Sequence, residues 1–216
     1  LIWAEQAMNE AGRTLPPALT AAIARIVPTL RALRHADGGL ARFQGGGRGA
    51  EGRLDQSLAE AGIKSDGTIG QTLTMGFARL SGGRTSVIVD VAAPAGGAAG
   101  RAAHASTAAF ELTSGRRPMI VSCGSGRQFG MDWWRAGRST ASHSTLSIEG
   151  NSSSRFGLTK DDSDILVERA QVSELKYATL DDGLHLSLMQ DGWARTHGLT
   201  HARELWLTPD GRKLAG

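Results

Sequence analysis

"HASTAAFELTSGRRPMIVSCGSG", residues 104–126, holds two short apolar runs on either side of a turn. In the first run, Ala108, Phe110 and Leu112 stand at every second position, which is the period of a half-buried β-strand. "SGRRP" breaks the pattern with turn residues, and "MIVSCG" resumes it as a second run. The stretch therefore predicts two neighbouring β-strands, with His104 at the head of the first.

The same pattern of short strands and turns extends over residues 71–216. Short runs rich in β-forming residues each end at a Gly, Pro, Asp or Asn turn signal, as expected for an antiparallel β-sandwich rather than a parallel α/β sheet. The predicted strands lie within "TLTMGFARLSGG", "TSVIVDVAAP", "STAAFELTSG", "RPMIVSCG", "STLSIEG", "DILVERAQV", "LHLSLMQDG" and "ARELWLTPDG". The chain is therefore expected to be mainly β, with its sandwich cut short at the C-terminus.

Residues 1–36 show helical spacing instead. "LIWAEQAMNEAG" ends on a glycine, and a second helix is expected from the proline pair at 16–17, with Pro28 kinking or dividing it. These helices are expected to be the end of a helical domain that lies mostly upstream. Residues 37–70 read as a glycine-rich linker with one short helix, "LDQSLAEAG", the last helix that the sequence predicts.

Composition limits the possible functions. The 24 basic and 21 acidic side chains give a net charge of +3, too small to indicate nucleic-acid binding. No apolar run approaches the roughly 20 residues of a membrane-spanning helix. A single cysteine, Cys123, excludes an internal disulfide.

Standard catalytic motifs are missing from the sequence. "GGGRGAEG" at 45–52 lacks the lysine and serine of a phosphate-binding loop, and "CGSG" at 123–126 lacks the context of a nucleophile turn. His104 and His143 remain, each expected at the start of a strand, where a sandwich can gather side chains from different strands. They are either hydrogen-bonded packing residues or part of a site.

Several motifs, in order, make the chain similar to one family. "DGGLARFQGGG" at 37–47, the opening stretch at 104–126, "HSTLSIEG" at 143–150 and "DGWARTHGLTHARELWLTPDG" at 191–211 resemble the β-sheet domain of heparinase II/III polysaccharide lyases. The resemblance implies an incomplete N-terminal α/α toroid followed by an antiparallel supersandwich. It also implies β-elimination at a uronic acid, a carbon–oxygen lyase reaction.

The resemblance also implies a site. His104 would act in or beside catalysis, or bind zinc together with His143 and Cys123, since two imidazoles and a thiolate suit that ion. The sequence departs from the family at three positions: Ala102 replaces a histidine, and Ser106 and Ser122 replace acidic residues. These departures also allow a histidine pair that holds no metal.

Substrate contacts are expected from the stretch "FGMDWWRAGR", read as a loop between strands. Tryptophan rings stack on sugars and guanidinium groups pair with carboxylates. The alternative is that the tryptophans anchor the loop and the arginines are solvated. The predicted contacts are Arg127, Trp133, Trp134, Arg135, Arg138 and His201.

These inferences predict part of a lyase that cleaves uronate-containing glycans such as heparan sulfate or alginate. The family's catalytic tyrosine lies in the toroid, and Tyr177 matches no family motif, so this chain alone is expected to be inactive. The expected partners are an acidic polysaccharide and the missing toroid, and the expected location is periplasmic or extracellular. One alternative is a non-catalytic carbohydrate-binding or cell-envelope protein. Another is a glycan-processing enzyme of a different reaction type, since fold does not fix function.

Overall fold

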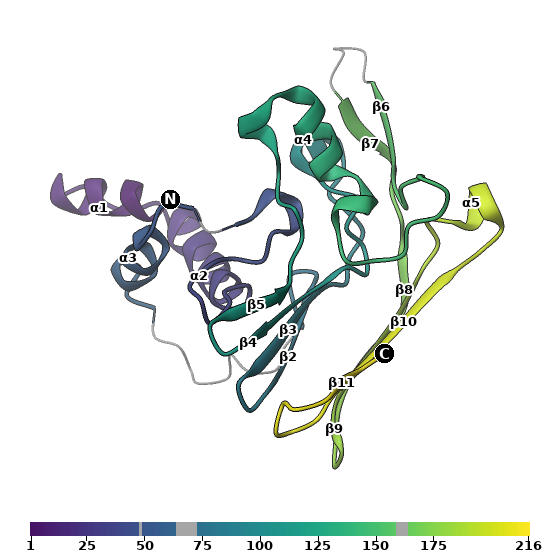
Figure 1. The fold of residues 1–216 in the computed structure, drawn as a ribbon. Coiled ribbons are helices and arrows are strands. Elements are labelled where there is room, and N and C mark those ends of the chain that lie inside the picture. Colours follow the sequence, from purple (N-terminus) through teal and green to yellow (C-terminus); the bar gives the residue numbers. More distant parts are fainter. Residues whose placement is uncertain (48, 64–72, 159–163) are drawn as a thin grey trace.

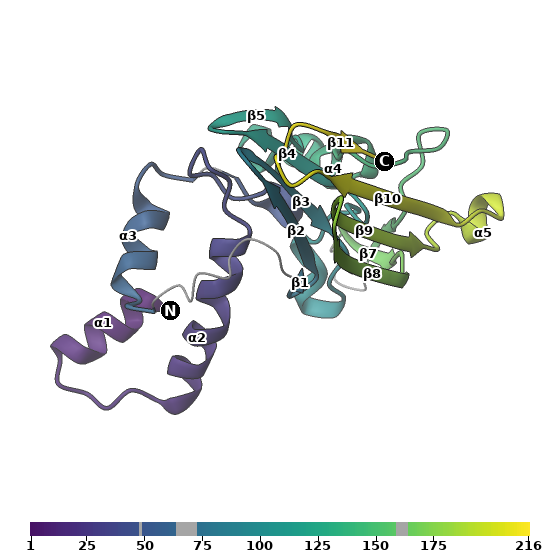
Figure 2. The ribbon, with the colours of Figure 1, turned by 90° about the horizontal axis from the view of Figure 1, so that it is seen from below.

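The computed structural model describes residues 1–47, 49–63, 73–158 and 164–216, and begins with helices (Figure 1). These are α1 (Ile2–Glu10), α2 (Pro17–Ala32) and α3 (Arg53–Glu60). Pro28 lies inside α2 without ending it. Ile23 and Val27 of α2 pack against Leu58 of α3 in a small apolar cluster. The helix expected within the linker therefore joins the helical layer, which lies to one side of the sheets (Figure 2).

Three antiparallel sheets follow within the described residues. The first sheet contains, in order, β1 (Leu73–Thr74), β2 (Phe77–Gly82), β3 (Thr85–Asp90), β4 (Phe110–Ser114) and β5 (Arg117–Ile120). The second has the order β11 (Leu214–Ala215), β10 (His201–Leu207), β9 (Gly183–Gln190) and β8 (Val172–Leu180). The third is a hairpin of β6 (Arg155–Leu158) and β7 (Asp164–Glu168).

The first two sheets face each other and share the main core (Figure 1). Val87 and Val89 of β3 pack in one buried cluster with Leu186 of β9 and Leu207 of β10. This burial of apolar surface between the two sheets is the main source of stability for a sandwich. The predicted antiparallel sandwich preceded by helices is confirmed. The predicted linker–sandwich boundary, at residues 70 and 71, lies outside the described residues.

Strand β4 is covered on both faces. Phe110 and Leu112 pack against the main core, as the alternation predicts. On the opposite face Glu111 and Thr113 are even more deeply buried, each 1% exposed. The covering layer there comes from the linker, where Phe43 packs with Ile88 and Ala109 in a second core.

Two glycine turns join the sheets at one end of the sandwich. Gly82 in the β2–β3 turn lies against Gly211 in the β10–β11 turn, where a Cβ would stand only 1.8 Å from the Gly82 carbonyl oxygen. Thr85 donates a hydrogen bond from Oγ1 to the Gly211 carbonyl at 2.7 Å. This close approach requires glycine, and Gly211 also has a positive φ of 68°.

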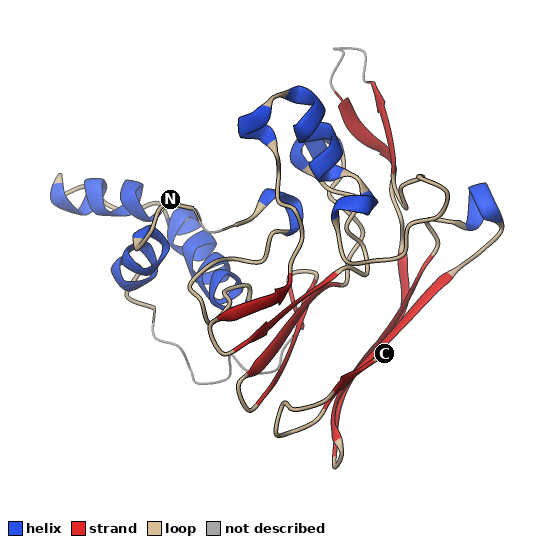
Figure 3. Ribbon diagram, in the orientation of Figure 1, coloured by secondary structure: helices blue, strands red, loops and turns tan. Residues whose placement is uncertain are grey.

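Three local expectations were wrong. "STLSIEG" forms an isolated bridge between Ile148 and Asn151 instead of a strand. The tryptophan stretch, expected to be a loop, forms helix α4 (Met131–Arg138), as Figure 3 shows. Its Gly137 lies so close to the chain before it that a Cβ would meet the Gly124 carbonyl at 2.6 Å. A further short helix, α5 (Ala194–His197), follows β9, so helices do not end at residue 62.

Across the described residues, no helix combines the length and the apolar character needed to cross a bilayer.

Candidate functional site

His104 and His143 form a buried pair. His104 lies ahead of β4, and His143 follows a 3₁₀ turn at Thr140–Ser142. Nδ1 of His104 is 3.1 Å from Nε2 of His143, a hydrogen-bond distance, and the two residues are 1% and 7% exposed. The two histidines that the sequence singled out are 39 positions apart, and the structure places them in contact.

The linker and α4 close over this pair. The Gln44 side chain accepts a hydrogen bond from the His104 backbone N–H at 2.8 Å. A Cβ on Gly45 would lie 3.6 Å from Nε2 of His104, so the linker backbone passes directly beside the ring. From α4, Arg138 donates through Nε to the Ala103 carbonyl at 2.9 Å. The imidazoles therefore lie in the protein interior.

Burial keeps both rings neutral. Burial is the largest cause that lowers the pKa of His104, and together with the neighbouring His143 and Arg138 it brings the pKa to about 3. Burial also lowers the pKa of His143 to about 4, although Glu111 acts in the opposite direction. A general base works best with a pKa near the operating pH. These two imidazoles are therefore weak bases as well as enclosed ones.

The donor set around the pair does not fit zinc. Cys123 is exposed, whereas its neighbour Ser122 is buried. The Ser122 hydroxyl and Nδ1 of His143 are buried without a hydrogen-bond partner. In the part of the chain that the structure describes, no three His, Cys, Asp or Glu side chains are grouped to hold a metal. A structural zinc site needs four ligands in a tetrahedron, and the described side chains do not supply them.

Glu111 is a buried carboxylate that the sequence reasoning missed. Its Oε2 lies 3.1 Å from Nε2 of His35, and its Oε1 accepts the backbone N–H groups of Arg42 and Ser122 at 2.9 and 3.1 Å. Burial alone would raise the pKa of Glu111, but these hydrogen bonds hold it below the ordinary value. The only signal in the sequence was an acidic residue within a strand that is otherwise uncharged.

Asp90 forms a second buried polar cluster with the linker. Ser106 donates to its Oδ2 at 2.6 Å, and the Gln44 amide donates to the same oxygen at 3.2 Å. Burial raises the pKa of Asp90 to about 6, and these hydrogen bonds oppose the rise. Ser106, one of the family-motif departures, thus ties the linker to the first sheet.

The predicted substrate contacts on and next to α4 fall into an exposed group and a buried pair. Trp133 is 63% exposed and its ring meets Phe129, 67% exposed, edge-on at 6.3 Å between centroids. Arg127 and Arg135 are exposed as well. Arg138 is fully buried, with its guanidinium 4.5 Å from the Trp134 ring centroid, so these two pack the helix onto the domain.

His201 lies on the second sheet, at the start of β10. Its Nδ1 is 3.3 Å from the Gln190 amide nitrogen, and burial lowers its pKa, helped by Arg203. Tyr177, on the edge strand β8, donates its hydroxyl to the Arg79 carbonyl at 2.9 Å. Neither side chain belongs to the His104–His143 pair.

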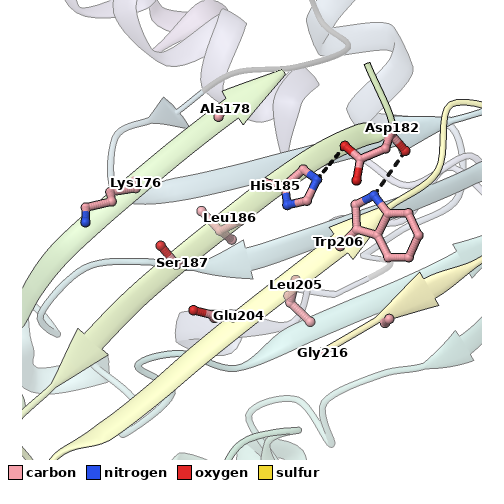
Figure 4. Close-up of a pocket in the computed structure, with 11 residues that line it drawn as sticks. Lys176, Ala178, Asp182, His185, Leu186, Ser187, Glu204, Leu205, Trp206 and Gly216 are labelled. Atoms are coloured by element: carbon pink, nitrogen blue, oxygen red, sulfur yellow. Dashed lines mark hydrogen bonds and ion pairs between the residues drawn. The ribbon is translucent and has the colours of Figure 1, made fainter. Parts of the chain in front are cut away.

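The outer face of the second sheet carries a shallow cavity of about 430 Å³ (Figure 4). Nε2 of His185 lies 2.9 Å from Asp182 Oδ1, and the Trp206 indole donates to the Asp182 carbonyl at 3.0 Å. Figure 4 places Ser187 beyond Leu186, away from the imidazole. The histidine and aspartate therefore lack a neighbouring nucleophile among the labelled side chains.

Comparison with known proteins gives both a family match and similar folds. Residues 69–216 match the family model described as Heparinase II/III-like, C-terminal. FtsZ-localized protein C of Caulobacter vibrioides (strain NA1000 / CB15N) is 33% identical over 222 residues, covering 100% of this chain and 37% of that protein.

Solved structures of heparinases share the fold. Heparan sulfate lyase HepC from Pedobacter heparinus aligns with 91% of this chain at a TM-score of 0.60 and 14% identity, and a HepC mutant aligns at 0.62 and 15%. The Heparinase III-BT4657 gene product aligns with 91% at 0.62 and 13%. The chain spans 31–32% of these solved chains, about a third of their length.

Proposed function

The chain belongs to the heparinase II/III-like C-terminal family, and from this membership we propose that it binds acidic polysaccharide without supplying the chemistry of β-elimination. One observation carries the proposal: in the interior of the protein, a ring nitrogen of His104 lies at hydrogen-bond distance from a ring nitrogen of His143.

β-Elimination at a uronate needs a base that reaches the proton beside the carboxylate. It also needs a group that stabilises the charge developing on that carboxylate. His104 is 1% exposed with a pKa of about 3, so it meets neither need. Tyr177 is hydrogen-bonded to the backbone, and burial raises its pKa to about 12. These properties favour a binding role for this chain.

The exposed tip of α4 supplies a suitable binding surface. Phe129 and Trp133 present aromatic faces on which sugar rings stack, and Arg127 and Arg135 are exposed nearby. Guanidinium groups bind carboxylate and sulfate through paired hydrogen bonds. Together these side chains favour an acidic glycan over a neutral one.

The similarity to FtsZ-localized protein C supports a role without glycan cleavage. Its name describes where that protein is found and names no reaction. The likeness covers this whole chain and 37% of that protein. For this chain we propose a role without glycan cleavage, as a carbohydrate-binding or cell-envelope protein that keeps the heparinase-like fold.

The second candidate is a lyase that cleaves uronate-containing glycans. The fold shared with heparan sulfate lyase HepC favours it. In that case the base must come from outside this chain, as the resemblance to a toroid-containing family implies. The periplasmic or extracellular location stays a prediction.

The test combines a binding assay with a lyase assay. Heparan sulfate, alginate and the neutral glucan pullulan are titrated into this chain and into Trp133→Ala. Ultraviolet absorbance of unsaturated uronate is followed with protein that also carries the expected upstream toroid. Binding of the acidic polymers that weakens in Trp133→Ala, without new absorbance, supports the proposal. New absorbance would favour the lyase, and no binding of either acidic polymer would overturn the binding role.

A further inference from the structure

A cavity of about 910 Å³ opens between α4, the β6–β7 hairpin and α5, apart from the histidine pair. In Figure 1 these three elements lie toward the same end of the second sheet. Its volume lies within the range of small-molecule sites, roughly 300–1,000 Å³. The walls are contributed by α4, residues 150–156, residues 168–170 and the segment around α5.

One carboxylate in this cavity serves two guanidinium groups. Oε1 of Glu168 accepts a hydrogen bond from Nη2 of Arg155 and lies 2.6 Å from Nη1 of Arg195. Within the described ranges, neither arginine has an ion pair with any other carboxylate. The two arginine side chains are 55% and 65% exposed, so most of their N–H donors face the cavity or solvent. This trio carries an excess positive charge that a second anion would neutralise.

The lining as a whole is nearly balanced in charge and includes several polar groups. Four arginines and three acidic residues line the cavity, which gives a formal charge of +1. Asp191 is already engaged, since its Oδ1 accepts the Gln171 backbone N–H at 2.7 Å. Hydroxyl and amide groups from Ser139, Asn151 and Thr196 complete the wall, and Phe156 supplies its aromatic ring.

We propose that this cavity binds an acidic sugar unit. Arg155 and Arg195 hold the sugar carboxylate on the side of their guanidinium groups away from Glu168. The serine, asparagine and threonine groups then meet the sugar hydroxyls. Arginine suits this task because its planar fork matches a carboxylate. The inference rests on the proposed function for its ligand class. The cavity shares Arg135 with the α4 surface but is not lined by Phe129 or Trp133.

The test uses tetragalacturonic acid and its methyl ester, in which each charged carboxylate is replaced by a neutral methyl ester. Calorimetric titration of the complete chain should show binding of the acid and little binding of the ester. Arg195→Gln should weaken binding of the acid about tenfold or more, the usual effect of losing a charged hydrogen bond. Arg212→Gln removes an exposed arginine on a distant turn and should leave binding unchanged.

A second variant gives an effect of opposite sign. Glu168→Gln removes the carboxylate that competes for both arginines, so it should tighten binding of tetragalacturonic acid several-fold. A merely structural Glu168 would not predict this gain. Thermal melting of each variant separates altered binding from altered folding.

The outcomes distinguish the two proposals. Binding of tetragalacturonate that depends on Arg195 but not on Trp133 supports the cavity, whatever the polymer experiment shows. If long acidic polymers bind through Trp133 while Arg195→Gln and Glu168→Gln change nothing, the cavity proposal is wrong and the α4 proposal stands. Equal binding of the acid and its methyl ester would also overturn the cavity proposal.

Discussion

His104 and His143 lie 3.1 Å apart, Nδ1 to Nε2, with both rings enclosed by the protein. A ring nitrogen of each is satisfied by the other, so the pair holds the segment before β4 against the turn after α4. The two imidazoles, which in an active site would lie in an open cleft, are here part of the packed interior.

The histidine pair should make the protein sensitive to acid. Both pKa values are lowered in the folded state, to about 3 and about 4, from an ordinary value near 6.5. The unfolded chain therefore takes up protons first as pH falls below about 6.5, and stability is lost down to about pH 3. Asp90, whose pKa is raised to about 6, acts in the opposite direction between about pH 6 and 4.

The contribution of His104 can be separated by substitution. His104→Asn keeps a polar group near the Nδ1 position, but asparagine does not titrate. Between pH 7 and 4 the variant should therefore lose less unfolding free energy than the unchanged chain, by on the order of 3 kcal/mol. Urea unfolding at several pH values measures this difference. Equal pH dependence in the chain and the variant would show that His104 is not buried and neutral.

Glu111 should be essential for stability. Glu111→Ala leaves His35 and the backbone N–H groups of Arg42 and Ser122 without their buried partner. The expected loss is about 3–5 kcal/mol, the range for removing one partner of a buried charged network. Glu204→Ala, on an exposed position of β10, should cost about 0.5 kcal/mol or less. Chemical denaturation compares the two, and a similar small loss in both would contradict the role given to Glu111.

The turn-to-turn contact predicts a strong effect at Gly211. A methyl group there would stand 1.8 Å from the Gly82 carbonyl oxygen, in addition to the strain of a φ of 68°. Gly198→Ala is the matched control, because Gly198 has a φ of 66° and open space around it. Gly211→Ala should therefore lose at least about 2 kcal/mol more than Gly198→Ala. Thermal unfolding of both variants provides the comparison, and equal losses would mean that the turns do not touch.

Zinc should leave the melting temperature unchanged. The two imidazoles contact each other, and the Cys123 thiol is exposed, so zinc would have to separate the pair to bind. A metal that binds only the folded state raises stability by mass action. A rise in melting temperature with excess zinc, abolished by Cys123→Ser, would restore the zinc site that the sequence predicts.

The neighbouring tryptophans of α4 should behave differently. Trp134→Ala removes the ring beneath the buried Arg138 guanidinium and should cost about 2–4 kcal/mol of stability. Trp133→Ala removes a largely exposed ring and should change stability by about 0.5 kcal/mol or less while weakening binding of acidic polymers. Melting curves and glycan titration together test this contrast. A stability loss of the same size in both variants would argue against an exposed binding surface.

Strand pairs that are close in sequence could be predicted because their signal is local. Alternating side chains and a turn identify β4 and β5 as neighbours, and this pair forms as expected. Helix α4 was missed because the glycines around it resemble loop residues. Gly126 and Gly137 instead let the helix lie against the preceding chain.

The two buried polar pairs differ in how they could be found. His104 and His143 stood at family-motif positions, so the resemblance identified them together. His35 and Glu111 are separated by 76 positions and belong to no periodic pattern. Their contact depends on how the linker folds across the first sheet, which single-sequence periodicity does not encode.

The linker contacts also bear on how this domain can be inherited. The family match begins at residue 69, yet Glu111 takes partners from His35 and Arg42, and Phe43 covers Ile88. A recombination event that moved only the matched segment would expose part of the core. It would also leave the buried Glu111 carboxylate without partners from His35 and Arg42. The smallest module that a gene fusion could transfer intact therefore begins no later than His35, so the evolutionary unit is longer than its sequence signature.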